Sequence, residues 1–360
     1  MRIFDTFPFD GELDLLEFRL RETFDLVDHF VLVEAAQTYR GTAKPFTFAD
    51  NKDRFAWAGE KIRHVRLAGL GHASASPRER AAVQRNAARL ALRDAAPDDL
   101  ILLLDVDEIP SRALLQSLRA GGLDRPRRLT MTRHYGFADA LGPSSPCCPN
   151  LADPFPVSTA RPRPGSWQAI AARWHGQSGV AAPVRALDGR TPFDLRFGLP
   201  LGDAIPDAGR HFTSVDPSTR LERKLSRVFH EEYDGPRETA PDHLARCRRY
   251  GVHHRGWWYA ERPSGPLPED LGRLLSAYPG LAAPPSRPAL ARRLVRSWSW
   301  LRLWKLLPDR AVGAVDRNFE YLAPLLALPL LLCDLGRAGL AIAMRATGTR
   351  LGGMRASRHI

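Results

Sequence analysis

The 360-residue sequence has only four cysteines, and two of them, Cys147 and Cys148, are adjacent. Neighbouring cysteines rarely bridge each other, and no C-x-x-C motif occurs, so a disulfide framework is excluded. This cysteine usage is typical of a reducing compartment. The N-terminal residues contain no apolar segment of the kind found in signal peptides, so we expect a cytoplasmic protein.

Long apolar runs are also scarce. The longest, Tyr321–Cys333, is interrupted by two prolines and is shorter than the roughly 20 residues that a membrane-spanning helix needs. Residues 281–360 carry thirteen Lys/Arg against four Asp/Glu, which accounts for +9 of the net charge of +12. Tryptophans alternate with basic residues in this tail, which favours peripheral docking on the anionic inner face of the cell membrane. Packing as a small helical unit is the alternative.

Residues 1–280 carry only +3 of the charge, so the basic balance does not indicate a nucleic-acid partner. We therefore divide the chain into a catalytic domain, residues 1–280, and a basic, Trp/Leu-rich tail, residues 281–360. A nucleic-acid binder would lose its function with the tail, whereas an enzyme built on residues 1–280 would keep its chemistry.

Hydrophobic periodicity in the first 140 residues predicts strands that alternate with helices. The predicted helices are Glu12–Phe24, Arg78–Asp94 and Ser111–Arg119. The predicted strands are Phe30–Glu34, Ile62–Leu67, Leu100–Leu104 and Arg128–Thr132. Such alternation is typical of an α/β fold with a mainly parallel central sheet. The proline-rich stretch Gly136–Pro164 is expected to form a long loop.

The most informative segment is the aliphatic run Leu100–Leu104, which is followed directly by Asp105, Asp107 and Glu108. Ligands of open α/β sheets bind beyond the carboxyl ends of the strands, where these acids would lie. Two aspartates one residue apart suit a hard divalent cation such as Mg²⁺ or Mn²⁺. The pattern therefore predicts a site for a metal-chelated nucleotide diphosphate. Capping of the next helix is the alternative role for these acids.

Several short motifs resemble glycosyltransferase family 17 in their order and spacing. They are Phe4–Phe9, Glu12–Leu20, Val33-Glu34 with Thr38, Asn51–Phe55, Arg78-Glu79, Gln84–Asn86, Asp105–Pro110, Gly209–Phe212 and Phe229–Glu231. The resemblance implies a GT-A-like fold and an inverting, metal-dependent transfer of N-acetylglucosamine from UDP-GlcNAc in a β-1,4 linkage. The family usually has Cys where Thr6 stands and Trp where Arg210 stands. We expect the acceptor to be a glycan or a lipid-linked saccharide.

The acidic motif and one distant histidine supply the predicted metal site. Asp107 is the candidate for direct coordination, with Asp105 contacting the metal or the donor ribose, and His211 is a third candidate ligand. The metal would neutralise the diphosphate leaving group. The base that an inverting transfer needs is assigned to Glu231, ahead of the other acidic candidates Asp139, Asp203 and Glu232.

Further donor contacts are predicted on the helix before the acidic motif. Arg85 would pair with a phosphate, while Gln84 and Asn86 would hydrogen-bond the sugar or base. Arg78 stands seven residues before Arg85, on nearly the same helical face. Glu34, at the end of a strand, would accept from the base or ribose.

Three other enzymes remain as alternatives. A sugar-phosphate nucleotidyltransferase would share the fold, but its Gly-rich phosphate loop is missing after the first strand. A transferase with a different nucleotide-sugar donor would share every feature above. A glycosidase would work without metal or nucleotide.

Overall fold

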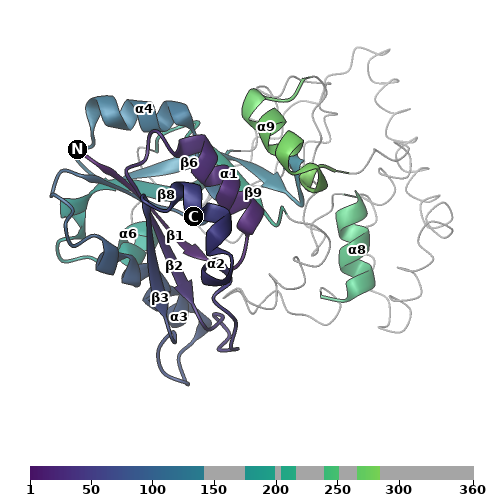
Figure 1. The fold of residues 1–360 in the computed structure, drawn as a ribbon, viewed down its shortest axis with the longest axis horizontal. Helices are drawn as coiled ribbons and strands as arrows, with labels where there is room; N and C mark the ends of the chain where they lie inside the picture. The colour runs from purple at the N-terminus through teal and green to yellow at the C-terminus, as the bar shows by residue number, and fades with distance from the viewer. Residues whose placement is uncertain (142–174, 199–203, 216–238, 251–265, 284–360) are drawn as a thin grey trace, which may run out of the picture. The chain divides into compact units, whose positions relative to one another are not determined.

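The computed structural model of the chain describes residues 1–141, 175–198, 204–215, 239–250 and 266–283 (Figure 1). The chain divides into two compact units, Met1–Pro285 and Ser286–Ile360, and all described residues belong to the first. Within these ranges no helix has the length and apolar character needed to cross a membrane. The predicted membrane contact of the tail lies outside the described residues.

One nine-stranded sheet organises the described chain. Its strands are β1 (Ile3–Phe9), β2 (His29–Ala35), β3 (Ile62–Leu67), β4 (Leu100–Leu103), β5 (Glu108–Pro110), β6 (Arg127–Tyr135), β7 (Phe137–Leu141), β8 (His175–Pro183) and β9 (Gly209–Thr213). They follow the order β3-β2-β1-β4-β8-β6-β9-β5, with β7 paired to β6. The half β3-β2-β1-β4 is parallel, whereas β8 runs antiparallel to both β4 and β6. The predicted α/β class is confirmed, but the sheet is mixed rather than mainly parallel, because the other half contains the antiparallel strands and one further parallel pair, β6–β9.

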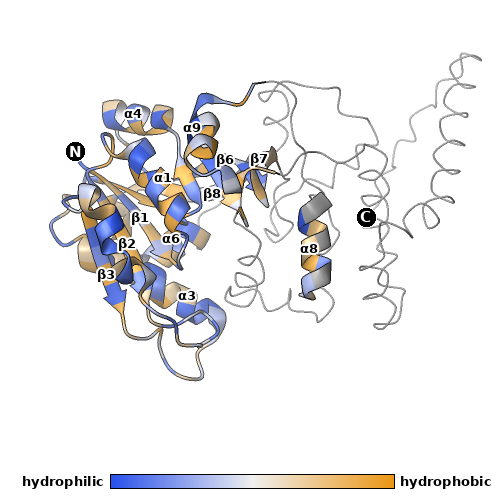
Figure 2. Cartoon of the chain, turned by 45° about the vertical axis from the view of Figure 1, so that its right-hand side comes forward, coloured by the Kyte–Doolittle hydropathy of each residue, from blue (hydrophilic) through white to orange (hydrophobic). Residues whose placement is uncertain are grey.

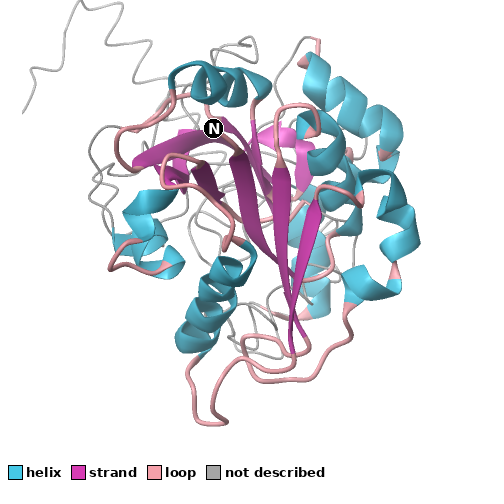
Figure 3. Cartoon of the chain, turned by 60° about the vertical axis from the view of Figure 1, so that its left-hand side comes forward, coloured by secondary structure: helices cyan, strands magenta, loops and turns pink. Residues whose placement is uncertain are grey.

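Helices cover both faces of the parallel half (Figure 3). They are α1 (Leu13–Thr23), α2 (Thr47–Asp50), α3 (Pro77–Asn86), α4 (Arg112–Gly121) and α6 (Pro192–Gly198), followed outside this half by α8 (Pro241–Tyr250) and α9 (Glu269–Ala277). Short 3₁₀ helices lie at η1 (Lys52–Ala58), η2 (Ala87–Ala91), η3 (Val184–Leu187) and η5 (Pro279–Leu281). Helices such as α1 and α4 carry both hydrophobic and hydrophilic segments (Figure 2), as expected of helices that pack on a sheet by one face.

The unbroken aliphatic run of β4 follows from burial on both faces. Leu100 and Leu102 pack in one core cluster with residues of α1 and α4. Ile101 and Leu103 pack in a second cluster with residues of η2, η3 and α6. All four side chains are at most 4% exposed. The acidic residues therefore follow directly on a strand that is buried on both faces.

The predicted elements are confirmed for most of this region, with two differences. The helix expected over Arg78–Asp94 is α-helical only to Asn86 and then tightens into η2, where Ala88 packs against the sheet. The loop expected from Gly136 begins instead with strand β7, because Gly136, with φ of +71°, makes the turn that folds β7 back on β6. The rest of that expected loop lies outside the described residues.

At Gly179 in β8 there is no room for a larger side chain. A Cβ atom at this position would overlap the Leu104 side chain and the backbone carbonyl oxygen of Leu103. We expect Gly179→Ala to lower the free energy of unfolding by about 1–3 kcal/mol, as overpacking does. The measurement is the urea midpoint of the purified variant.

Gly272→Ala is the matched control for this substitution. Gly272 lies inside α9 with open space around its Cα, so the added methyl should stabilise the helix by about 0.5–1 kcal/mol. Equal midpoints for the two variants would contradict the close packing described at Gly179.

Candidate active site

The acidic turn, Asp105–Glu108, follows β4 at the edge of the sheet where β1 and β2 also have their carboxyl ends. A backbone hydrogen bond of 3.0 Å from Glu108 to the carbonyl of Asp105 closes the turn. The buried Glu108 carboxylate accepts a hydrogen bond of 2.8 Å from the Asp105 backbone N–H. The carboxylate of Glu108 thus stabilises the turn, whereas the side chains of Asp105 and Asp107 contact groups outside it.

Arg19 of α1 is the principal support of the acidic turn. Its Nη1 donates to the carbonyl oxygens of Asp105, Val106 and Glu108 at 2.8, 3.2 and 2.7 Å. The rest of its guanidinium binds both oxygens of Asp5 in β1, at 2.7 and 2.5 Å. Both side chains of this ion pair are fully buried. One arginine therefore joins α1 and β1 to the turn.

Sequence reasoning did not identify Arg19 as a site residue. The available signal was its position four residues after Leu15 and three after Leu16, on the buried face of an amphipathic helix. A charged residue there must be paired, because an isolated buried charge is very costly. Its partner Asp5 stands in the middle of an otherwise apolar strand, which is a second signal of the same kind.

Asp105 lies between two arginines. Its carboxylate forms ion pairs with Arg85 of α3 and, at 2.8 Å, with Arg196 of α6. Burial alone would raise the pKa of Asp105, but the charges of Arg196 and Arg85 outweigh it, so the pKa lies below its usual value. Asp105 therefore stays ionised, with both oxygens engaged by guanidinium groups.

Arg196 also binds Glu108, at 2.9 Å to each carboxylate oxygen, and donates to the Leu103 carbonyl at 2.7 Å. Burial lowers its pKa, but Asp105 and Glu108 raise it further, and it remains a cation. Sequence reasoning missed Arg196, because α6 lies 91 residues after the acidic turn and only the fold brings them together.

His211 of β9 lies next to Asp107, as predicted. Its Nε2 is 3.7 Å from Asp107 Oδ1, and its Nδ1 is 3.4 Å from Ser178 Oγ and 3.8 Å from Glu108 Oε1. Burial, followed by the charge of Arg133, lowers the pKa of His211 despite the neighbouring acids. The imidazole is therefore neutral at pH 7. An Nδ1–H directed at Ser178 or Glu108 would leave Nε2 as a lone-pair donor beside Asp107.

The chemistry of these donors fits a hard divalent cation that also binds phosphate. A carboxylate oxygen and a neutral imidazole nitrogen lie side by side, and Mg²⁺ is commonly held by only one or two protein ligands plus substrate phosphates. The described residues contain no group of three His, Cys, Asp or Glu side chains arranged for a metal. Asp107 and His211 are accordingly the residues that would hold the ion, while Asp105 is bound by Arg85 and Arg196.

The other predicted donor residues have structural partners in this state. Gln84 donates to the Val33 carbonyl at 2.7 Å, and Asn86 accepts from the Phe193 backbone N–H at 2.9 Å. Glu34 is fully buried, accepts from the Phe48 N–H at 2.8 Å and lies 3.0 Å from His64 Nε2. These contacts tie α3, α6 and α2 to the sheet. Donor contacts by Gln84, Asn86 and Glu34 stay predictions.

The predicted catalytic base is not placed by the structure. Glu231 lies outside the described residues, as do the alternatives Asp203 and Glu232. Asp139 is described, and it is fully buried in β7, where it accepts a hydrogen bond of 2.8 Å from Ala283. An enclosed carboxylate of this kind does not meet an acceptor hydroxyl.

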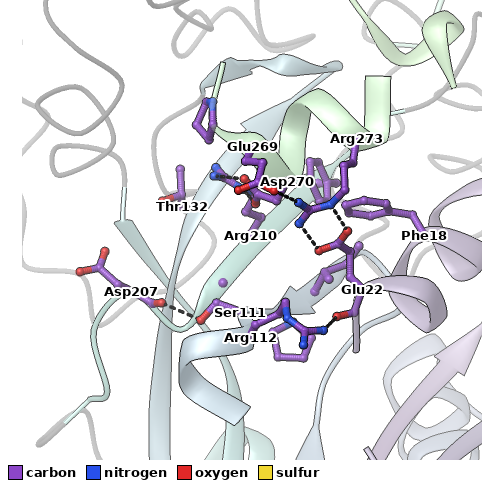
Figure 4. A pocket seen from close by; sticks show the side chains of 15 residues that line it. Phe18, Glu22, Ser111, Arg112, Thr132, Asp207, Arg210, Glu269, Asp270 and Arg273 are labelled. Atoms are coloured by element: carbon purple, nitrogen blue, oxygen red, sulfur yellow. Dashed lines mark hydrogen bonds and ion pairs between the residues drawn. The ribbon is translucent and has the colours of Figure 1, made fainter. Parts of the chain in front are cut away.

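A cavity of about 440 Å³ lies on the opposite face of the β5–β9 ladder (Figure 4). Side chains alternate between the faces of a strand. Glu108 and His211 are opposite each other in the ladder, and their side chains lie on the side of Asp107. The side chains of the next pair, Ile109 and Arg210, lie on the other side and line the cavity. Arg210 binds Asp270 of α9 there, with one contact of 2.9 Å. Burial would raise the pKa of Asp270, but Arg210 outweighs it and lowers the pKa.

The fold and site together define an α/β domain with an acidic turn, bound by three arginines, at the carboxyl edge of its parallel strands. Residues 1–138 match the model of glycosyltransferase family 17, so the predicted resemblance is confirmed for that part of the chain. The motifs around His211 and Glu231 lie beyond the matched residues.

Two relatives and two solved structures are similar to parts of this chain. The rat and human β-1,4-mannosyl-glycoprotein 4-β-N-acetylglucosaminyltransferases are each 31% identical over 147 residues, which is 38% of this chain and 27% of theirs. The chain thus spans about a quarter of the length of these relatives. Glucosyl-3-phosphoglycerate synthase of M. tuberculosis matches 63% of this chain and 80% of its own, with 16% identity and a TM-score of 0.31. A second mycobacterial protein matches at 15% identity and the same TM-score, over 63% of this chain and 74% of its own. The fold described above rests on the strand order of this chain.

Proposed function

We propose that this protein is a GT-A-like, metal-dependent glycosyltransferase that uses a nucleotide-diphosphate sugar. The observation that carries the proposal is the pair Asp107–His211, 3.7 Å apart at the carboxyl edge of the sheet, beside Asp105 held by two arginines. The match of residues 1–138 to glycosyltransferase family 17 supports the same class. By analogy with the similar rat and human enzymes, we propose N-acetylglucosamine as the transferred sugar and a β-1,4 linkage. UDP-GlcNAc as the donor and a glycan or lipid-linked saccharide as the acceptor stay our predictions from the sequence.

The proposed reaction is an inverting displacement at the anomeric carbon. The acceptor oxygen forms a bond to that carbon, the bond to the diphosphate breaks, and its electron pair leaves with the diphosphate. A divalent cation, when bound, supplies the charge that neutralises this leaving group. Asp107 and His211 would hold the ion, and Arg85 and Arg196 would add positive charge where the diphosphate becomes more negative. The acceptor proton goes to a base, for which Glu231 stays our prediction.

The experiment that tests this function is turnover of a nucleotide-sugar panel. UDP-, GDP- and CDP-sugars are incubated with the full chain and a set of saccharide and lipid-linked acceptors, with Mn²⁺, with Mg²⁺ and with EDTA. We expect one UDP-sugar to be consumed in the presence of metal, and no consumption with EDTA. Turnover that continues in EDTA, or hydrolysis of glycans without any nucleotide, would contradict the proposal. Binding of the tail, residues 281–360, to anionic vesicles is a separate prediction and does not bear on this result.

A further inference from the structure

Phe197, at the end of α6, is a large aromatic side chain left 40% exposed within 6 Å of three guanidinium groups. The guanidinium carbons of Arg85, Arg196 and Arg78 lie 5.4, 5.6 and 5.9 Å from the centre of its ring. Two of these arginines are the ones that hold Asp105 of the acidic turn. We call these four residues, Arg78, Arg85, Arg196 and Phe197, the arginine–phenylalanine cluster.

Phe197 lies on the outer side of α6. Leu195, two residues earlier and therefore on the opposite side of the helix, is completely buried and contributes to the core against the sheet. The Phe197 ring is tilted by 47° to that of Phe193, with ring centres 4.6 Å apart. A 40% exposed aromatic ring beside the arginines that hold the acidic turn is the type of group on which a nucleobase stacks.

The arginines of the cluster have unused capacity to bind an anion. Side chains of Arg85 and Arg196 are only 9% and 7% exposed, and the Nε–H of each has no hydrogen-bond partner among the residues that the structure describes. Arg78 is exposed, and in the described part of the chain its guanidinium contacts only the rings of Phe193 and Phe197, without a carboxylate. Buried donors without partners and an uncompensated cation both favour a phosphate nearby.

We propose that the arginine–phenylalanine cluster binds the nucleoside diphosphate part of the donor. Phe197 stacks on the base, and Arg78 adds charge for the phosphates beside Arg85 and Arg196. The inference rests on the proposed function, because it assigns the nucleotide subsite of the same active site. It also gives α6 a specific role, since this one helix brings both Arg196 to the acidic turn and Phe197 to the base.

The test is calorimetric titration of the full-length protein with nucleoside diphosphates and, separately, with inorganic pyrophosphate, in Mn²⁺. The diphosphate used for the variants is whichever of UDP, GDP, CDP and ADP the wild type binds most tightly. The variants are Phe197→Ala, Phe197→Tyr and Arg78→Ala. Both positions are exposed, so folding is expected to survive, and a thermal melt of each variant verifies this.

Two control variants remove matched groups from the other end of the sheet. Trp57→Ala deletes a 38% exposed aromatic ring that also lies under a guanidinium, Arg21, at 4.5 Å. Arg93→Ala deletes an exposed cation next to Asp94, whose carboxylate binds Arg2 and Arg63 at the amino ends of β1 and β3. These controls separate loss of the cluster from general loss of aromatic surface or charge.

We expect Phe197→Ala to weaken nucleoside diphosphate binding by about 5- to 150-fold, the effect of one lost base stack, and to leave pyrophosphate binding unchanged. Phe197→Tyr, which keeps the ring, should bind like the wild type. Arg78→Ala should weaken both ligands by about 10-fold, as loss of one charged hydrogen-bond donor does. Trp57→Ala and Arg93→Ala should match the wild type.

Three results would overturn the assignment while the proposed function stands. One is a Phe197→Ala variant that binds the diphosphate as tightly as Trp57→Ala. Another is an equal loss of pyrophosphate and nucleotide affinity in that variant, because a stacked base cannot explain it. The third is an Arg78→Ala variant with wild-type affinities. If the wild type binds none of the four nucleoside diphosphates, the proposed function fails, and this assignment fails with it.

Discussion

Replacement of Asp107 by asparagine is expected to lower kcat/KM for nucleotide-sugar turnover by about 100-fold or more. A metal ion contributes several kcal/mol of transition-state charge stabilisation, and each 1.4 kcal/mol is a factor of ten in rate. Asparagine keeps the size of the side chain but removes the negative charge that would hold the ion beside His211. In the same variant, affinity for the nucleoside diphosphate in Mn²⁺ should fall to the value that the wild type shows in EDTA.

Asp98→Asn is the control for this charge change. Asp98 precedes β4 at its amino end, its side chain is 83% exposed, and it pairs with Arg185. Its neutralisation alters the net charge equally but should leave metal-dependent binding intact. Wild-type turnover by Asp107→Asn, with unchanged dependence on Mn²⁺, would show that the ion is held elsewhere or is not required.

Replacement of Arg19 by methionine is expected to lower the free energy of unfolding by about 3–5 kcal/mol, the usual result of breaking a buried ion pair from one side. The Asp5 carboxylate would be left buried without its partner, and three carbonyl oxygens of the acidic turn would lose their donor. Guanidinium chloride unfolding, followed by circular dichroism, measures the change.

Two further variants make this prediction specific. Arg21→Met changes an arginine one half-turn away on the same helix, but that side chain is 56% exposed, pairs with Glu17 and lies over the Trp57 ring. Its cost should be at most about 1 kcal/mol. A double variant, Asp5→Leu with Arg19→Met, should recover part of the loss, because it removes the unpaired carboxylate. Equal stabilities for Arg19→Met and Arg21→Met would contradict the supporting role given to Arg19.

Local sequence patterns predicted three of the four strands in the parallel half of the fold, β2, β3 and β4, but not β1. The helix α1 was predicted because its apolar residues repeat at the helical period, and the strands β2 and β4 were predicted because they are continuous apolar runs. Strand β5 was not predicted. It has three residues, and it exists because Glu108 and Ile109 pair with His211 and Arg210 about a hundred positions later. Long-range pairing of so short a strand leaves no periodic signal.

In the candidate site, too, some residues could be predicted from local sequence motifs, whereas others depend on which helices the fold brings together. Asp105, Asp107, Arg85 and His211 were predicted, and the structure brings these four together. Arg196 and Phe197 could not be predicted, because their importance depends on α6 packing beside α3. Gln84 is buried and donates to the Val33 carbonyl, and its contact with the donor stays a prediction. The sequence alone does not show which polar residues of a helix pack inward.

The central claim is that the acidic turn binds a metal–nucleotide complex through Asp107 and His211. The most direct test is a crystal structure of the protein with Mn²⁺ and UDP, with data recorded at the manganese absorption edge. We predict an anomalous peak within about 2.0–2.3 Å of an Asp107 oxygen and of His211 Nε2, with the diphosphate completing its coordination. UDP bound without an ion at the acidic turn, or bound in the cavity beside Arg210 and Asp270, would contradict the claim.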